Sequence, residues 1–232
     1  MQRIPRGVAD DRLAVVRTRA GELIALDPRT GVVRWRAGRG LRPCAVTAHS
    51  VVAVRADDPN GPAVVVLDSE DGREVWTAAL PTVPDWAQRA VADDPTSSLD
   101  CTVDGEQVLL RWAASTRYEG GAAPSARTLD EHKREAYGAV RVDLRARALQ
   151  PVAPGALIAR AQDEGTTDAA AASRHLGADV LDAGRVGGVR IELATPEATD
   201  AVVLRGVDVA DDAVLWEVAL DEKARRPPPL RP

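Results

Sequence analysis

The sequence has no long apolar run. Nowhere does it reach the roughly 18 consecutive apolar residues that a membrane-spanning helix needs. Its first residues, from Met1 to Arg6, also lack the apolar core of a secretory signal. We therefore expect the chain as written to be cytoplasmic, and to be exported or membrane-anchored if further sequence precedes Met1.

Cysteine and histidine are scarce. The two cysteines, Cys44 and Cys101, suit neither a disulfide scaffold nor a zinc site, which would need about four clustered Cys and His ligands. The three histidines, His49, His132 and His175, lie far apart without metal-ligand spacing. No nucleophile elbow, phosphate-binding glycine loop or C-x-x-C pair occurs. We therefore expect no enzyme activity, no bound metal and little redox chemistry.

The composition is that of an ordinary globular protein. Its 232 residues include 30 Lys and Arg against 35 Asp and Glu, and 45% of them are hydrophobic. The resulting net charge of −5 and the pI near 5.3 argue against a nucleic-acid partner.

A repeated string is the main signal in the chain. An apolar run leads to an Asp, which is followed by a Gly four positions later and a Trp eight positions later. A third copy keeps the Asp and Trp but has Asp212 in place of Gly, and a fourth has Arg147 and Pro151 in place of Gly and Trp. The residues that we assign to the motif are Asp27, Gly31 and Trp35; Asp68, Gly72 and Trp76; Asp208 and Trp216; and Asp143.

Each copy predicts a β-hairpin with a tight polar turn. An Asp that begins such a turn can accept hydrogen bonds from backbone N–H groups two or three residues on, and the Gly supplies a positive φ. Asp212 can adopt that conformation next best, whereas Arg147 should alter the turn or strain it.

A second hairpin precedes each copy, so every unit contains four short strands. Four such units predict an all-β array of about four four-stranded antiparallel blades of the β-propeller type, with short helical inserts. We expect the propeller over residues 1–222, followed by a Pro- and Arg-rich tail at 223–232. The expected blades are 1–38, 39–80, 96–153 and 177–221, with inserts at 114–137 and 155–176.

The first copy, from Ala25 to Trp35, resembles the tryptophan-docking motif of quinoprotein-like propellers, also called pyrroloquinoline-quinone (PQQ) repeats. This resemblance implies that Trp35, Trp76 and Trp216 are structural and pack against the turn of an adjoining blade. It also raises the alternative of a PQQ-dependent oxidoreductase or a fragment of one. Members that bind the quinone have adjacent cysteines and calcium ligands, which this chain does not reproduce, so we expect no cofactor.

We expect the inserts to contain the partner-binding sites, because function commonly lies on loops that a rigid scaffold positions. Both inserts are expected to contain short helices, over residues 126–136 and 168–176. The contact candidates are Trp86, Tyr118 and His132.

The resulting expectation is a non-enzymatic scaffold that presents rim loops to an unidentified protein partner. Four blades are fewer than the rings usual for such propellers, so three outcomes stay open. The four blades close a small ring, two chains join into an eight-bladed ring, or missing blades of a larger membrane-anchored propeller complete it. We favour an open arc that needs a partner.

Overall fold

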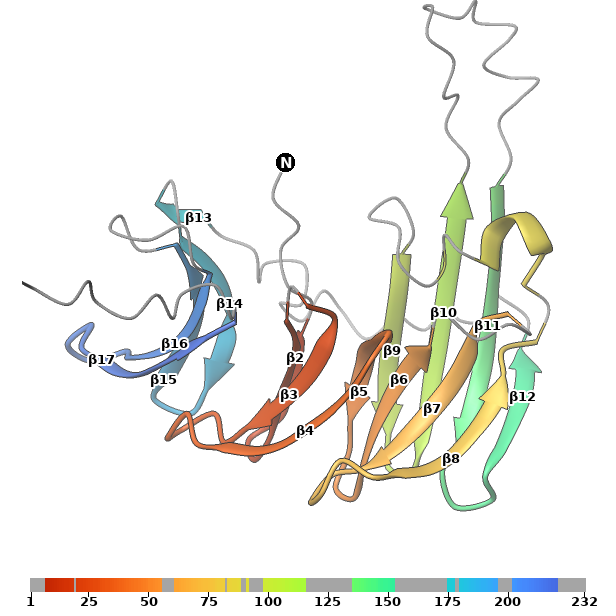
Figure 1. The fold of residues 1–232 in the computed structure, drawn as a ribbon, viewed down its shortest axis with the longest axis horizontal. Coiled ribbons are helices and arrows are strands. Elements are labelled where there is room, and N and C mark those ends of the chain that lie inside the picture. Colours follow the sequence, from red (N-terminus) through yellow and green to blue (C-terminus); the bar gives the residue numbers. More distant parts are fainter. Residues whose placement is uncertain are drawn as a thin grey trace, which may run out of the picture. The chain divides into compact units, whose positions relative to one another are not determined.

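The structure is a computed structural model that describes residues 7–18, 20–55, 61–81, 83–88, 91, 98–115, 135–152, 175–177, 180–195 and 202–220. Its strands form four antiparallel sheets, three of four strands and one of five (Figure 1). This confirms the expected all-β array of antiparallel blades. Two compact units divide the sheets: unit 1 comprises residues 1–4 and 40–161, and unit 2 comprises residues 5–39 and 162–232.

Unit 2 contains two sheets, which we call sheet I and sheet IV. In both, each strand pairs with its neighbour along the chain. Sheet I consists of β1 (Gly7–Ala9), β2 (Ala14–Arg17), β3 (Glu22–Leu26) and β4 (Val33–Arg39). Sheet IV consists of β13 (His175–Gly177), β14 (Val180–Val186), β15 (Val189–Ala194), β16 (Val203–Asp208) and β17 (Val214–Ala219). Their shared core includes Ile24, Leu26, Ile191, Leu193 and Leu204.

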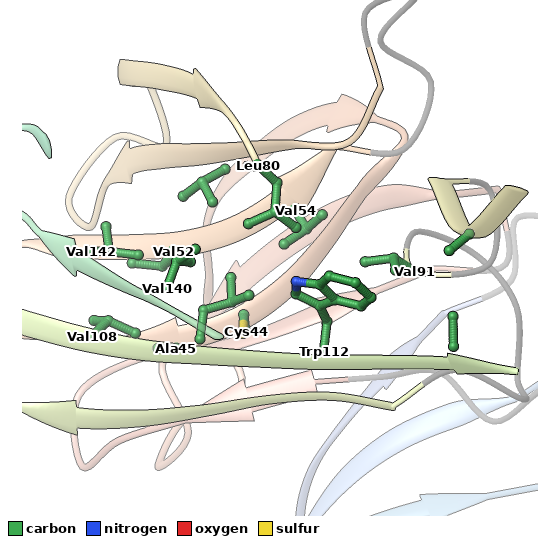
Figure 2. Close-up of a cluster of buried hydrophobic side chains, with 14 residues drawn as sticks. Cys44, Ala45, Val52, Val54, Leu80, Val91, Val108, Trp112, Val140 and Val142 are labelled. Carbon is green, nitrogen blue, oxygen red and sulfur yellow. The ribbon is translucent and has the colours of Figure 1, made fainter. Parts of the chain in front are cut away.

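Unit 1 contains sheet II and sheet III, joined by a short 3-10 helix, η1 (Asp85–Ala87). Sheet II consists of β5 (Leu41–Val46), β6 (Ser50–Arg55), β7 (Ala63–Asp68) and β8 (Glu74–Ala79). Sheet III consists of β9 (Ser98–Asp104), β10 (Gln107–Ser115), β11 (Glu135–Asp143) and β12 (Ala148–Val152). Valines of β6, β10 and β11 meet around Trp112 in the core between the two sheets (Figure 2).

The repeated turns have the predicted chemistry. Asp27 accepts hydrogen bonds at Oδ1 from the backbone N–H groups of Arg29 and Thr30, at 2.9 and 3.2 Å. The corresponding aspartates bond in the same way to the backbone amides of Glu70, Ala146 and Ala210. Asp212 and Arg147 adopt positive φ angles of 59° and 52°. Arg147 therefore carries the backbone strain that the sequence predicted for that turn.

The prediction of short helices in the inserts is wrong at the carboxyl end of each helix. Glu135 and Ala136 belong to β11, where they pair in register with Ser115 and Ala114. His175 and Leu176 lie in β13. In both places pairing with a neighbouring strand overrides the local helical preference, because the ladder supplies backbone partners along the whole segment. The other residues of the two expected helices lie outside the described part of the chain.

Candidate functional site

Trp216 joins the two sheets of unit 2. Its indole Nε1 donates a hydrogen bond of 3.1 Å to the carbonyl oxygen of Pro28, in the β3–β4 turn of sheet I. A Cβ placed on Gly31 would lie 2.7–2.9 Å from the Trp216 side chain, so the ring rests directly on the turn backbone. The turn thus receives the Trp of another sheet, as the docking arrangement requires.

A second glycine lets the same ring lie flat on its own sheet. Gly206 of β16 is the cross-strand partner of Trp216, and a Cβ there would come within 2.3 Å of the indole. In the first copy the position opposite Trp35 holds Ala25, another small residue. The second copy differs, since Val66 lies opposite Trp76, so a small residue at this position is not common to the repeats.

The other tryptophans lie in different surroundings. Trp35 in β4 is buried, and Trp76 in β8 packs, partly buried, against the core of unit 1. Trp112 is only 3% exposed and lies over Gly138, where a Cβ would be 2.7 Å from the ring. Trp112 therefore belongs to the core of unit 1.

Of the three residues expected to contact a partner, the structure describes only Trp86. Trp86 lies in η1 rather than in an open loop, and it packs, half-buried, against the core of unit 1, which leaves only part of the ring for a partner. Tyr118 and His132 lie outside the described residues.

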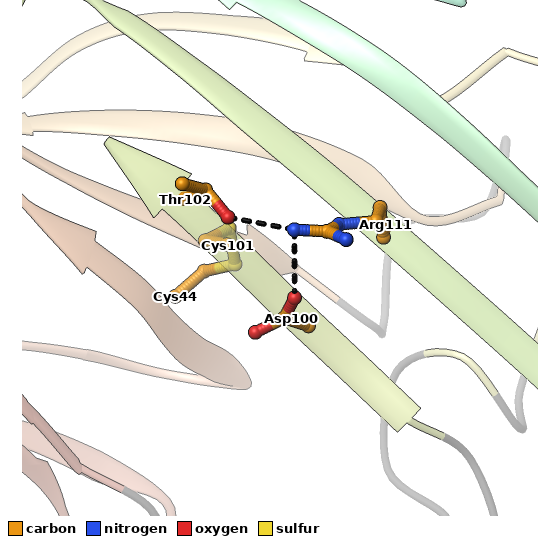
Figure 3. The surroundings of a disulfide bond; sticks show 5 residues. All are labelled: Cys44, Asp100, Cys101, Thr102 and Arg111. Atoms are coloured by element: carbon orange, nitrogen blue, oxygen red, sulfur yellow. Dashed lines mark hydrogen bonds and ion pairs between the residues drawn. A yellow bond between two sulfur atoms is a disulfide. The ribbon is translucent and has the colours of Figure 1, made fainter. Parts of the chain in front are cut away.

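The two cysteines, which we expected to suit neither a disulfide scaffold nor a zinc site, are bonded to each other. Cys44 of β5 and Cys101 of β9 form a disulfide, with Cα atoms 5.6 Å apart (Figure 3). The register of β5 shifts between Pro43 and Ala45, so Cys44 is the unpaired residue of a β-bulge, a feature that re-aims a side chain. Because both cysteines occupy the same position in the first strand of consecutive units, aligning those strands could have predicted the bond.

Arg111 holds β9 from the other face of sheet III, on both sides of Cys101. Its Nη2 donates to Thr102 Oγ1 at 2.7 Å and lies 3.3 Å from Asp100 Oδ2 (Figure 3). The first strand of sheet III is therefore attached to its own sheet by this arginine and to sheet II by the disulfide.

Sheet IV carries a charged cluster around a buried carboxylate. Glu192 is only 2% exposed, and its two oxygens accept hydrogen bonds of 2.7 Å from Arg190 Nε and Arg205 Nε. Arg190 also bonds to Asp212 at 2.8 Å, and these two carboxylates raise the pKa of its guanidinium. Every charge in the cluster has an opposite partner, which is the condition for a stable buried ion.

Sheet III differs from sheet II in the way its strands are buried. The residues of β7 from Ala63 to Leu67 are buried without a break. Along β10 and β11 buried and accessible residues alternate. Sheet III therefore has one face in the core of unit 1 and one polar face in contact with water.

The described residues show neither a metal-binding cluster nor a membrane-spanning helix. Among the described residues, no group of three or more His, Cys, Asp or Glu side chains is arranged to hold a metal ion. None of the helices in that part of the chain is long and apolar enough to cross a membrane.

Comparison with known proteins places the chain in a family. A family model described as the outer membrane protein assembly factor BamB matches residues 2–180. No match is found among curated proteins.

Three solved structures resemble the chain at low sequence identity. BamB from Moraxella catarrhalis is 16% identical over 92% of this chain, with a TM-score of 0.36. The uncharacterized protein lmo1340 from Listeria monocytogenes EGD-e is 6% identical over 90%, with a TM-score of 0.36. The WD40 domain of SCAP from fission yeast is 8% identical over 93%, with a TM-score of 0.34. The alignments cover 63%, 63% and 43% of those three chains.

Proposed function

Because the chain belongs to the family of the outer membrane protein assembly factor BamB, we propose that it is a non-enzymatic scaffold that holds a protein partner. The match over residues 2–180 is the observation that carries this proposal, since it covers three of the four sheets and their turns. The family name describes assembly of other proteins, an activity that needs a binding surface rather than a catalytic centre.

The construction of the two units supports a rigid scaffold. In unit 1 a buried core and a disulfide join two sheets, and in unit 2 a buried core and the docked Trp216 do so. Rigid sheets hold exposed side chains in a fixed arrangement, which lowers the entropy lost on binding.

The disulfide supports a place of action outside the reducing cytosol. Bonds between cysteines persist in oxidising compartments and are rare in cytosolic proteins. The sequence alone suggested a cytoplasmic location. In this proposal we instead place the protein in an exported or membrane-associated setting. Completion of a ring by a second copy stays a prediction.

Crosslinking in the native host tests the scaffold. A photoreactive phenylalanine derivative replaces Trp86, Val32 or Tyr137, which have exposed surface, or Val52, which is fully buried and serves as the control. We expect one protein to be captured reproducibly from at least one of the exposed positions and not from Val52. Equal yields from all four positions would show that no specific partner binds.

A separate measurement tests the non-enzymatic part of the proposal. A ligand that binds the folded state raises the melting temperature in proportion to its binding. We expect PQQ with calcium to leave the melting temperature unchanged. A shift that saturates with concentration would instead support the oxidoreductase alternative.

A further inference from the structure

The polar face of sheet III is built as a terminal surface of unit 1. In β10, Val108, Leu110 and Trp112 enter the core, whereas the residues between them point to the opposite face. Terminal units of stacked repeats need such a polar outer face to remain soluble. Among the described residues, Leu109, Tyr137 and Val152 are the larger apolar side chains on this face, and they stand between charged and amide side chains.

The edge strand β12 of sheet III is also poorly suited to docking a Trp on a further turn and to pairing with an added strand. Pro151 occupies the position at which the other copies carry the docking Trp, so this strand has no ring to place on a further turn. Proline also lacks the N–H that a strand added to the β12 edge would need. The side chains of the exposed face are the surface of this sheet that we consider for a partner.

A hollow of about 390 Å³ lies on this face, over the ends of β10, β11 and β12 that are nearest to the β11–β12 turn. The strand register places Gln107, Asp143 and Ala148 in one row across the sheet. Arg141 and Gln150 stand side by side in the next row. Leu149 completes the lining.

Arg141 is the chemical centre of the hollow. It is exposed, and within the described part of the chain it makes no hydrogen bond or ion pair. Of the acids in these rows, Asp143 accepts a hydrogen bond of 2.7 Å from the backbone of Ala146, and Asp104 lies at the β9 end of the row of Gln107. Among the described side chains, none takes up the donors of this guanidinium.

We propose that this hollow binds a carboxylate of an extended acidic segment in the protein partner. A guanidinium matches a carboxylate with two parallel hydrogen bonds. The amides of Gln107 and Gln150 can donate to and accept from the backbone of the same segment, as Asp143 can accept from it. The charge of Asp143, two residues from Arg141 on the same face, opposes a doubly charged phosphate more strongly than a singly charged carboxylate.

This assignment deepens the proposed scaffold function and rests on it. It assigns the partner contact to the polar face of sheet III and the partner's contacting segment to an acidic one. Tyr137 lies on the same face and is 70% exposed, and tyrosine and arginine are the residue types enriched at protein interfaces.

Binding of an acetylated, fluorescently labelled hexaglutamate peptide tests the assignment. The anisotropy of the label is measured at an ionic strength of about 0.15 M, where the net charge of the chain is screened beyond about 8 Å. The variant Arg141→Gln removes the central charge. Its matched control, Arg145→Gln, makes the same change in the exposed β11–β12 turn of the same sheet. Neither arginine has a partner among the described residues, so both variants should fold normally.

We expect Arg141→Gln to weaken peptide binding at least about tenfold and Arg145→Gln to change it less than about twofold. Equal weakening by both variants would mean non-specific attraction to positive charge and would overturn the site. Absence of binding to the unaltered chain would overturn it as well. Displacement of the peptide by inorganic phosphate at lower concentration than by acetate would assign the hollow to phosphate instead.

These results are separable from the test of the scaffold itself. Crosslinks from Trp86 or Val32 together with no peptide binding would reject the hollow and retain the scaffold. Absence of specific crosslinks from every position would reject the scaffold.

Discussion

Removal of the Cys44–Cys101 disulfide should destabilise unit 1 more than any single surface change. The bond closes a loop between residues 57 apart in the sequence. In the chain-entropy account, a cross-link of that span lowers the entropy of the unfolded chain by an amount equivalent to about 4 kcal/mol at room temperature. Most of this should be lost in a Cys44→Ala/Cys101→Ala variant, because it removes the cross-link while the pairing of β5 with β6 and of β9 with β10 is kept.

Urea unfolding followed by tryptophan fluorescence measures the effect. The signal from Trp112 reports on unit 1, because its ring lies in the core between sheets II and III. With about 2 kcal/mol per molar as a usual urea slope, a loss of about 4 kcal/mol corresponds to a midpoint about 2 M lower. Hydrogen exchange should locate the loss at β5 and β9, which are in contact with each other.

The variant has an internal control in reductant. Reduced wild-type protein and the double-alanine variant should unfold at the same midpoint, because neither has the cross-link. The reasoning is refuted if a fully reduced wild-type chain, with two free thiols by alkylation, unfolds at the same urea concentration as the oxidised chain.

Three further perturbations test the turns and the docking contact. Gly206→Ala places a Cβ 2.3 Å from the Trp216 indole and should lower the free energy of unfolding in urea by about 1–3 kcal/mol. The control Gly38→Ala, with no atom within 4 Å of the added Cβ, should change it by less than about 0.5 kcal/mol. Equal effects of the two variants would contradict the docking geometry. Arg147→Gly removes the strain of a positive φ and should raise the unfolding free energy by about 1 kcal/mol, and a decrease would show that the turn is not strained. The hydrogen bond from Arg34, with those from the turn amides, lowers the pKa of Asp27, so its contribution is present above its unfolded-state pKa of about 3.9 and is lost as the pH falls through the lower folded-state pKa. Acid titration of thermal stability should therefore show Asp27→Asn less stable than wild type at neutral pH, with the difference shrinking in strong acid; a constant difference would contradict this.

Local chemistry made the hairpins and turns predictable from the sequence. Asp27 and its counterparts bind backbone N–H groups two or three residues ahead, and this interaction needs no distant part of the chain. Asp212 could be predicted to replace glycine for the same reason, since the preference for positive φ belongs to the residue itself.

The ends of the inserts were beyond this kind of reasoning. Alanine, glutamate and arginine favour a helix in isolation, but Glu135 and Ala136 continue the β10–β11 ladder. Each segment extends a strand because a neighbouring strand offers it backbone hydrogen-bond partners. The helix preference of the segment's own residues carries no information about that neighbouring strand.

The sequence by itself determined the repeated four-strand unit, the turn chemistry and the tryptophans that recur in it, because each depends on residues only a few positions apart. Only the tertiary structure decided which faces and side chains meet. Cys44 and Cys101 bond because a bulge aims one strand at the next sheet, and Arg141 lies in a hollow because the register of three strands places it there. These contacts join residues from separate strands and sheets, and they exist only after the strands have paired and the sheets have packed.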